Sequence, residues 1–532
     1  HPEQDSSQAS PARRTPPGCR MTVLHSRWVT TTGHVAGIAL LFVAAGMSLG
    51  AVIELFDGTE APAMLVAAAV TAVAGAGLRY ATRPGTIDRA TVFTAVAGTW
   101  LVVSAVGSLP YLLAGTFSRS GVGPLIVLAD ALFESVSGYT ATGSTVFGSH
   151  NLITDQGAGI LMYRQFTQWI GGMGIVVLVV TVLPSLRASG LGLISAEAPG
   201  TGGDRLAPRM ADTARHFWYL YAGLTALIAV ALLAAGMTPY DAVAHAFTTA
   251  STGGFSTHDA SIGYWDSVAV EMVVMIGLVL GALSFTLHGR ALATRRLVHR
   301  KDAEFRGYIG VLTCATLLVT LMLATGGGMG PARALRMAAF NVITLGTSGG
   351  FGNATGPGSD GDFAAWAAGP QFLLLLLLVS GGCTGSTSGG VKIMRLIVGV
   401  SHARRTLRGI RRPRAVLPVR HGSGTISDSI VERIAGFMVV YGMLVVTGTV
   451  VVTALGTDLV TAISGVIGCL GNMGPVLNRA GPTASFVDGF STPARTVLAV
   501  LMLVGRLELF PMLLMAVAPY RSVRRSLRHR SG

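Results

Sequence analysis

Thr252-Gly253-Gly254-Phe255 is one of four short, glycine-centred stretches that recur along this chain of 532 residues. The other three are Thr142-Gly143-Ser144-Thr145, Ser348-Gly349-Gly350-Phe351 and Leu470-Gly471-Asn472-Met473. Each follows an apolar stretch of about 12–14 residues, which is too short to cross a bilayer, and each is flanked by two longer apolar segments. Four units of helix, short helix, glycine turn and helix are what a pore with four pseudo-symmetric walls requires. The repeated stretches therefore predict an all-α polytopic membrane protein built around one pore.

The composition favours a membrane protein, because 51% of the residues are hydrophobic and only 12% are charged. Many windows reach the ~20 apolar residues that span a bilayer core. The net charge of +14 comes mainly from arginines in short loops between apolar segments. This pattern reflects membrane topology and gives no reason to expect nucleic-acid binding. The four cysteines contain no CxxC pair, so neither a disulfide framework nor a zinc site is expected.

Segment length predicts about ten membrane helices. They are expected at 33–56, 62–80, 91–117, 157–186, 215–237, 262–288, 307–328, 364–402, 430–455 and 492–518. The segment 364–402 is too long and too rich in glycine to be one straight helix. The first two segments precede all four glycine turns, so they are expected to form an added hairpin.

These segments divide the chain into a disordered tail, a leading two-helix hairpin, four pore repeats and a basic tail. The predicted bounds, in that order, are 1–32, 33–84, 85–190, 205–300, 301–415, 425–520 and 521–532. Loops rich in arginine and lysine all fall on one side of the membrane when ten spans are threaded in this way. The positive-inside rule makes that side cytoplasmic, with both termini on it. The four glycine turns should then enter the membrane from outside.

The repeated turns have the chemistry of an ion pathway. A cation can cross the membrane only where oxygens replace its water shell, and backbone carbonyls can do this where glycine permits unusual dihedral angles. Thr142, Thr252 and Ser348 would add a hydroxyl at three walls, whereas Leu470 would make the fourth wall different. The alternative is that small residues merely allow close helix packing, but four such turns on one face favour the pore.

The candidate ion-binding residues are the four residues around each turn. They are Ala141, Thr142, Gly143, Ser144, Ser251, Thr252, Gly253, Gly254, Thr347, Ser348, Gly349, Gly350, Cys469, Leu470, Gly471 and Asn472.

The chain resembles the Trk/Ktr/HKT superfamily of potassium transporters, and most closely its TrkH-type bacterial subunits. Four stretches carry the resemblance, which covers about residues 30–520: 137–143 (SGYTATG), 164–174 (RQFTQWIGGMG), 381–392 (GGCTGSTSGGVK) and 505–508 (GRLE). In HKT relatives, a serine in place of the first filter glycine accompanies sodium transport. This chain has glycine in all four of the glycine-centred turns, so the resemblance implies potassium selectivity. It also implies a location in the bacterial plasma membrane.

Five glycines between Gly381 and Gly390 interrupt an apolar helix, and each disfavours helix by about 1 kcal/mol relative to alanine. A phosphate-binding loop is excluded because no GK[ST] follows, while a plain flexible kink stays open. The resemblance implies an intramembrane gate below the filter, with Lys392 at its cytoplasmic exit. The implied gate residues are Gly381, Gly382, Gly385, Ser386, Thr387, Gly389, Gly390, Lys392 and Arg506.

Arg506 is a functional candidate in its own right, because an isolated arginine inside a membrane is costly. The resemblance implies that it faces the pore and narrows it electrostatically. Pairing with Glu508 is the structural alternative. Asp130, Glu134 and Asp241 are expected to cap the short helices, and His245 and His258 are expected to be structural or exposed to solvent.

The leading hypothesis is a potassium-uptake subunit that conducts K⁺ like a channel and needs no cofactor. A symporter that couples K⁺ to H⁺ or Na⁺ is the alternative, and Glu271 and Glu508 are the acids that could serve it. An enzyme is disfavoured because the spans hold no cluster of catalytic side chains. The resemblance also implies a homodimer and a cytosolic, TrkA-like nucleotide-binding ring, for which the basic segments 290–306 and 400–414 are candidate docking surfaces.

Overall fold

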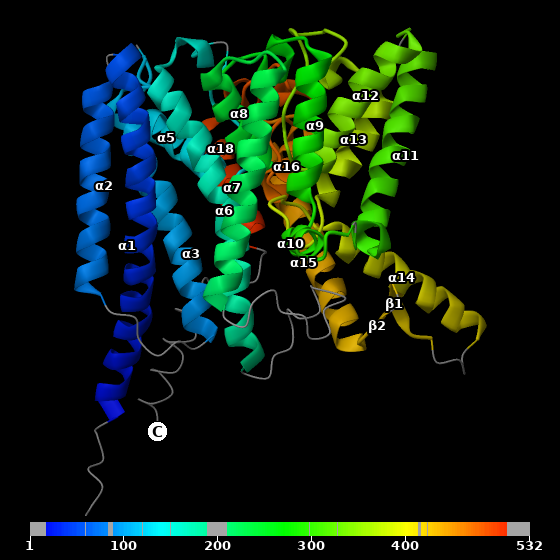
Figure 1. Ribbon diagram of the computed structural model, residues 1–532, viewed down its shortest axis with the longest axis horizontal. Coiled ribbons are helices and arrows are strands. Elements are labelled where there is room, and N and C mark those ends of the chain that lie inside the picture. Colours follow the sequence, from blue (N-terminus) through cyan, green and yellow to red (C-terminus); the bar gives the residue numbers. More distant parts are fainter. Residues whose placement is uncertain are drawn as a thin grey trace, which may run out of the picture.

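The computed structural model describes residues 17–58, 60–82, 89–119, 121–148, 150–188, 210–296, 298–326, 328–412, 417–422 and 424–507. Helices make up nearly all of its regular structure, which confirms the all-α prediction (Figure 1). One antiparallel hairpin is present among the described residues: β1 (Val419–His421) pairs with β2 (Gly424–Ile426). The predicted basic tail at 521–532, residues 1–16 and Glu508 lie outside the described residues.

The leading hairpin consists of α1 (Pro17–Asp57) and α2 (Ala61–Ala81). The two helices approach closely, since a methyl group on Gly37 would lie 2.7 Å from the carbonyl oxygen of Gly75. The prediction of a disordered tail through residue 32 is wrong from Pro17 onward, because that segment is the start of α1. Proline is well tolerated at the start of a helix, and no further proline follows before Asp57 to break it.

Four successive groups of helices follow the hairpin. Their bounds are α3 (Arg89–Val106), α4 (Leu109–Leu113), α5 (Pro124–Tyr139), α6 (Ala158–Ala188); α7 (Met210–Ala234), α8 (Pro239–Ala250), α9 (Val268–Ala282), α10 (Phe285–Thr294); α11 (Ala303–Gly326), α12 (Pro331–Gly346), α13 (Ala368–Ser380), α14 (Ile393–Arg411); and α15 (Asp428–Ala454), α16 (Leu459–Gly471), α17 (Phe486–Gly489), α18 (Thr492–Arg506). Short 3₁₀ turns lie between them: η1 (Ile153–Asp155), η2 (Ser261–Tyr264), η3 (Val298–Lys301), η4 (Phe363–Ala365) and η5 (Asn478–Ala480).

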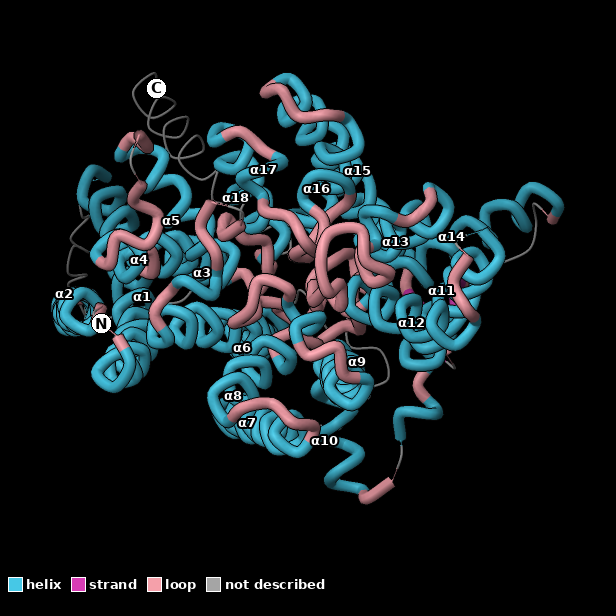
Figure 2. Tube along the Cα trace, turned by 90° about the horizontal axis from the view of Figure 1, so that it is seen from above, coloured by secondary structure: helices cyan, strands magenta, loops and turns pink. Residues whose placement is uncertain are grey.

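Viewed from above, the helices surround a centre in which many loops gather (Figure 2). Three buried apolar clusters hold this arrangement together. The first joins the hairpin to the first and last groups, the second lies around α11 to α13, and the third joins α7 to α9. The loops are thus enclosed on the sides by packed helices.

Within the described residues, six helices are long and apolar enough to cross a membrane. They are α1, α2, the α3–α4 segment, α7, α11 and α15. The pair α9 and α10, bent by 95°, can be counted as a seventh. The predicted straight span at 262–288 is therefore wrong: it begins with a 3₁₀ turn, and its helix ends at Ala282.

The reason for the break after α9 is a competing set of hydrogen bonds. The N–H groups of Thr387 and Cys383 donate to the carbonyls of Gly281 and Ala282, at 3.3 and 2.8 Å. The N–H of Phe285 donates to the carbonyl of Gly385 at 3.1 Å. A loop distant in sequence thus occupies backbone groups that a continuous helix would use itself.

Candidate functional site

Four short helices, α5, α8, α12 and α16, lead into the loops at the centre of the molecule. Three of them begin with proline, at Pro124, Pro239 and Pro331, which is favoured at the first helical position. The fourth begins at an N-cap, where Asp458 accepts the N–H of Thr461 at 3.1 Å. These sequence signals set where each short helix starts.

Each short helix ends in the same backbone turn. An N–H bonds to the carbonyl five residues earlier in every case: Thr142 to Ser137 (2.9 Å), Gly253 to Thr248 (2.8 Å), Gly349 to Thr344 (2.7 Å) and Met473 to Gly468 (2.8 Å). The residue before each donor has a positive φ, at Ala141 (51°), Thr252 (53°), Ser348 (58°) and Asn472 (53°). This combination is the Schellman ending of a helix. It defines four equivalent turns.

We number these turns by their residues. Turn 1 is Ala141-Thr142-Gly143, turn 2 is Thr252-Gly253-Gly254, turn 3 is Ser348-Gly349-Gly350 and turn 4 is Asn472-Met473-Gly474.

The last glycines of the four turns form a closed ring. A methyl group on Gly143 would collide with the carbonyl of Gly253, and one on Gly254 would collide with the carbonyl of Gly349. A methyl group on Gly350 would lie 3.1 Å from the nitrogen of Gly474, and one on Gly474 would lie 2.8 Å from the carbonyl carbon of Gly143. Each turn therefore contacts the next, and the fourth contacts the first. Only glycine fits where four backbones approach so closely.

The predicted register is right for turns 2 and 3 and shifted for the other two. Turn 1 begins at Ala141, one residue before the phrase Thr142-Gly143-Ser144-Thr145, although Ala141 is among the predicted ion-binding residues. Turn 4 begins two residues later than the predicted phrase, at Asn472, because Cys469, Leu470 and Gly471 still belong to α16. Gly474 was missed. Aligning the four stretches on their last glycine, as x-x-Gly, would have found it.

This register changes which wall is chemically distinct. The fourth turn presents Asn472 where Leu470 was expected, and its amide donates to Thr142 Oγ1 at 3.1 Å. The first turn presents Ala141 at the position that carries a polar side chain in the other three. The wall without a polar group at this position is thus the first.

A hollow of about 70 Å³ lies against the ring. All four ring glycines line it, together with Arg164 and His258. The described residues contain no group of three or more His, Cys, Asp or Glu side chains that could hold a metal ion.

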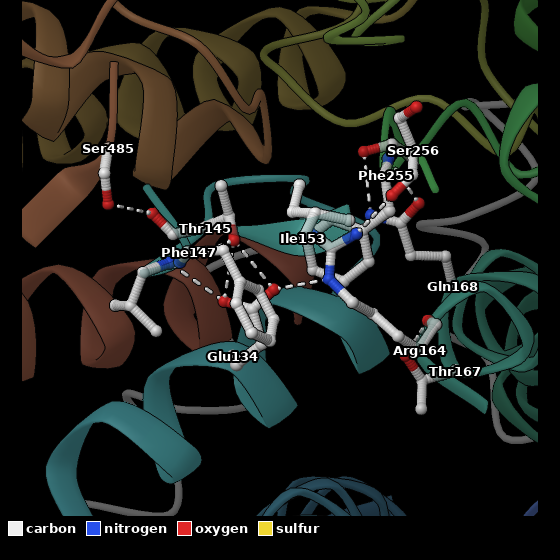
Figure 3. A network of polar contacts seen from close by, with 12 residues as sticks. Glu134, Thr145, Phe147, Ile153, Arg164, Thr167, Gln168, Phe255, Ser256 and Ser485 are labelled. Carbon is white, nitrogen blue, oxygen red and sulfur yellow. Dashed lines mark hydrogen bonds and ion pairs between the residues drawn. The ribbon is translucent and has the colours of Figure 1, made fainter. Parts of the chain in front are cut away.

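A buried polar network lies between turns 1 and 2 (Figure 3). Glu134 of α5 accepts the N–H of Val146 at 3.0 Å and the hydroxyl of Thr145 at 3.0 Å. Arg164 of α6 donates to Glu134 at 2.6 Å and to the carbonyl of Ser256 at 2.9 Å. The expectation that Glu134 caps its helix is wrong, because it lies near the middle of α5 and supports the residues that follow turn 1.

The neighbouring residue on the same face of α6 supports turn 2 directly. Gln168 donates to the carbonyl of Gly253 at 2.8 Å and accepts the N–H of Phe255 at 3.0 Å. Arg164 and Gln168 are four residues apart, which places them on one face of a helix. Two residues of the stretch 164–174 thus hold the second turn.

Comparable supports recur at equivalent positions in the other short helices. Glu134, His245 and Asn341 each precede the positive-φ residue of their turn by seven positions (134 and 141, 245 and 252, 341 and 348). His245 bonds the hydroxyl of Ser256 at 2.9 Å, and Asn341 donates to the side chain of Asn353 at 3.0 Å. The fourth helix has Gly465 there, against which the ring of Phe490 packs. His245 is thus structural, as predicted.

The segment 381–392, which we call the central loop, lies between α13 and α14. Positive φ angles at Gly381 (65°), Gly385 (77°) and Gly390 (77°) end the helix and shape the loop. The loop contacts two of the turns, since Thr387 Oγ1 lies 3.3 Å from Thr252 Oγ1 and Ser388 Oγ lies 2.8 Å from Ser348 Oγ. The predicted helix break is therefore present and lies directly against turns 2 and 3.

Further contacts fix the ends of the central loop. Glu304 of α11 accepts the N–H of Thr384 at 2.7 Å. Lys392 is buried and its ammonium group donates to the carbonyl of Ser388. Gly389 donates its N–H to Ser348 Oγ at 2.9 Å. The loop is thus held by neighbouring helices as well as by the turns.

Arg506 is buried and bridges two elements. Its guanidinium donates to the carbonyl of Thr387 at 3.0 Å and to that of Gly171 in α6 at 2.8 Å. The central loop, α6 and α18 thus meet at one charged side chain. The alternative pairing with Glu508 involves a residue outside the described part of the chain.

Comparison with known proteins identifies the family. A family model described as TrkH, cation transport protein, matches residues 60–524. The chain belongs to the TrkH family. It is 40% identical over 77% of its length to the Trk system potassium uptake protein TrkH of Halomonas elongata, covering 82% of that protein. It is 37% identical over 78% of its length to the TrkH of Escherichia coli, covering 83% of that protein.

The fold of this TrkH-family chain matches a solved structure as well. The crystal structure of the potassium transporter TrkH from Vibrio parahaemolyticus aligns with a TM-score of 0.80 and 34% sequence identity. The alignment covers 92% of this chain and 98% of that one. The chain is thus a multi-pass membrane protein of a transporter family.

Two acids with a predicted role, Asp130 as a helix cap and Glu271 as a candidate for ion coupling, are paired in this TrkH-family structure. Asp130 does not cap α5; it forms a buried ion pair with Arg495 of α18, at 2.7 Å. Glu271 is bonded by Arg336 of α12 at 2.9 Å and by the amide of Asn353 at 3.2 Å. Asp241 lies in the first turn of α8, but the N-cap is Thr238, whose hydroxyl accepts the N–H of Asp241 at 3.1 Å; the Asp241 carboxylate accepts the hydroxyl of Thr257 at 2.7 Å.

Proposed function

We propose that this protein takes up potassium across the bacterial plasma membrane through the ring of four glycine turns. The observation that carries the proposal is the closed contact of Gly143, Gly254, Gly350 and Gly474 at the centre of the molecule. Membership of the TrkH family and the potassium uptake function of its named relatives support it. K⁺ is the transported ion, and no cofactor takes part.

The electrostatics of the site favour a cation. Four short helices end at the ring, and each directs the partial negative charge of its C-terminus toward it. Backbone carbonyls in such a filter replace the water that a potassium ion gives up. Because the ring is built from backbone, its charge does not depend on the titration of side chains.

The central loop and Arg506 form the gate in this proposal. The loop contacts turns 2 and 3 through Thr387 and Ser388, and Arg506 ties the same loop to α6. Opening would therefore require these hydrogen bonds to break or rearrange. An arginine at this position would also repel cations while it stays in place.

Passive, channel-like flux is favoured over symport with H⁺ or Na⁺. A coupled carrier needs an acid on the pathway that can exchange its partner. Glu271 is bonded by both Arg336 and Asn353, so it is poorly suited to that role. Single-channel steps in a planar bilayer would support the channel, since a coupled carrier gives none.

We also propose a homodimer with a cytosolic, TrkA-like nucleotide-binding ring. Exposed arginines lie on α14, which extends away from the bundle in the lower part of Figure 1. Others lie near η3, at Arg295, Arg296 and Arg300. In the orientation that the positive-inside rule predicts, both termini and these basic surfaces are cytoplasmic.

Uptake of ⁸⁶Rb⁺ into proteoliposomes tests the proposal. Wild-type protein should take up Rb⁺ in competition with K⁺ and only weakly with Na⁺. Gly143→Ser should abolish this preference, because the added side chain meets the backbone of turn 2. Gly121→Ser is the matched control: Gly121 has a similar φ of 84° against 87°, but no atom lies within 4 Å of the added group. Retained preference in Gly143→Ser, or no Rb⁺ uptake by the wild type, would overturn the proposal.

A further inference from the structure

Arg164 carries a positive charge that neither the ring nor the gate explains. It is 1% exposed, and it lines the hollow that lies against the four ring glycines. Burying an arginine is costly unless every part of it is paired. Its surroundings therefore indicate what it does.

The guanidinium of Arg164 connects two walls. Its Nε donates to Glu134, which in turn accepts the N–H of Val146 just after turn 1. Its Nη1 donates to the carbonyl of Ser256 just after turn 2. The face of the ring of Phe255 lies 3.5 Å from the guanidinium carbon. The Arg164 side chain, together with Glu134, thus links the segment that follows turn 1 to the segment that follows turn 2 (Figure 3).

The other walls have no carboxylate at the corresponding position. Glu134 is matched by His245, Asn341 and Gly465 in the other three short helices. The first wall is therefore the one whose support is a carboxylate, and Arg164 is the cation that neutralises it. Without Arg164, a buried carboxylate would lie beside the ion pathway and would itself attract cations of any kind.

We propose that Arg164 and Glu134 are positioning residues that fix the spacing of turns 1 and 2 and thereby set ion selectivity. This inference rests on the proposed function, because it assigns a role within the same ring. The pair does not bind the ion. It acts through Thr145, Val146 and Ser256, whose positions decide where the backbone of the two turns lies.

The experiment compares three single variants in proteoliposomes. Glu134→Gln removes the charge and keeps the shape, whereas Arg164→Lys keeps the charge but cannot reach Glu134 and Ser256 in the same planar geometry. Asp130→Asn is the matched control: Asp130 lies one helical turn before Glu134 on α5 and also forms a buried ion pair, but its partner is Arg495 of α18 and not a residue next to a turn. Each protein is measured for its thermal unfolding midpoint in detergent and for its K⁺ over Na⁺ uptake ratio.

We expect Glu134→Gln and Arg164→Lys to lower the K⁺ over Na⁺ ratio by roughly tenfold, the scale of one lost hydrogen bond to a charged group. Asp130→Asn should lower the unfolding midpoint and leave the ratio unchanged. If Glu134→Gln does not fold, Arg164→Lys decides the matter, because it retains the buried charge pair.

Two results would overturn the inference while leaving the proposed function intact. One is a wild-type ratio in folded Glu134→Gln and Arg164→Lys. The other is an equal loss of selectivity in Asp130→Asn, which would show that the ratio only follows overall stability. Absence of K⁺-selective uptake by the wild type would instead overturn the proposed function, and the inference with it.

Discussion

At the scale of single residues, the ring shows how strongly close backbone contact restricts composition. Gly143 and Gly254 have positive φ and face a neighbouring carbonyl, so a side chain there meets both backbone strain and a collision. The preceding position varies between the turns: Thr142 in turn 1 and Met473 in turn 4 occupy the place held by glycine in turns 2 and 3. Selectivity should therefore depend most strongly on the last glycine of each turn.

Arg506→Ala should raise the rate of K⁺ uptake. The substitution removes a buried positive charge and both hydrogen bonds, to Thr387 and Gly171, that hold the central loop to α6. The rate of ⁸⁶Rb⁺ uptake into proteoliposomes measures the effect. Arg506→Lys separates charge from geometry. Its ammonium keeps the positive charge but lacks the planar guanidinium that donates to two carbonyls at once. Unchanged uptake in folded Arg506→Ala would remove this residue from the gate.

At the scale of elements, the central loop is the part whose structure depends most on its neighbours. Its backbone closes the end of α9, its side chains contact turns 2 and 3, and Glu304 at the start of α11 holds Thr384. Movement of α9, α11 or α18 therefore acts on the same short segment. This arrangement connects the end of α9, the start of α11 and the end of α18 to the ring through one short segment.

Ser388→Ala should loosen this segment and increase uptake. The hydroxyl of Ser388 bonds that of Ser348 at 2.8 Å and accepts the N–H of Gly382 at 2.8 Å. The bond to Ser348, which joins the loop to turn 3, is worth about 0.5–1.5 kcal/mol net, so its loss should raise the open population roughly two- to tenfold. The uptake rate under K⁺ limitation measures it.

Ser380→Ala serves as the control for that change. Ser380 is also buried and lies near the same loop, but its hydroxyl donates to Leu377 within its own helix, at 2.9 Å. We expect little change in uptake. An equal increase in both variants would mean that the contact between Ser388 and Ser348 is not what restrains the loop.

At the scale of the whole molecule, the leading hairpin is attached to the first repeat through a buried carboxylate. Glu54 of α1 is fully buried and accepts the N–H of Gly159 at 2.7 Å, in the first turn of α6. A negative charge at this end of a helix is stabilising. The hairpin thus supports the helix that carries Arg164 and Gln168, without contributing to the ring itself.

Glu54→Ala should therefore lower stability and leave ion selectivity unchanged. Loss of the carboxylate at the start of α6 should cost about 1 kcal/mol or more, seen as a lower thermal unfolding midpoint. Glu60→Ala is the comparison, because Glu60 precedes α2 and makes no capping hydrogen bond. A change in the K⁺ over Na⁺ ratio of Glu54→Ala would show that the hairpin acts on the ring after all.

Much of this architecture follows from the sequence by itself. Apolar segment lengths and the glycine stretches predicted an all-α membrane protein, the register of turns 2 and 3, and the break at Gly381, because these features depend on local composition and backbone preference. Only the tertiary structure decided the bend after Ala282 and the partners of Glu134, Asp130 and Arg506. These features depend on hydrogen bonds between residues 30 to 365 positions apart. No local sequence pattern specifies which distant donor will bond to a given buried acceptor.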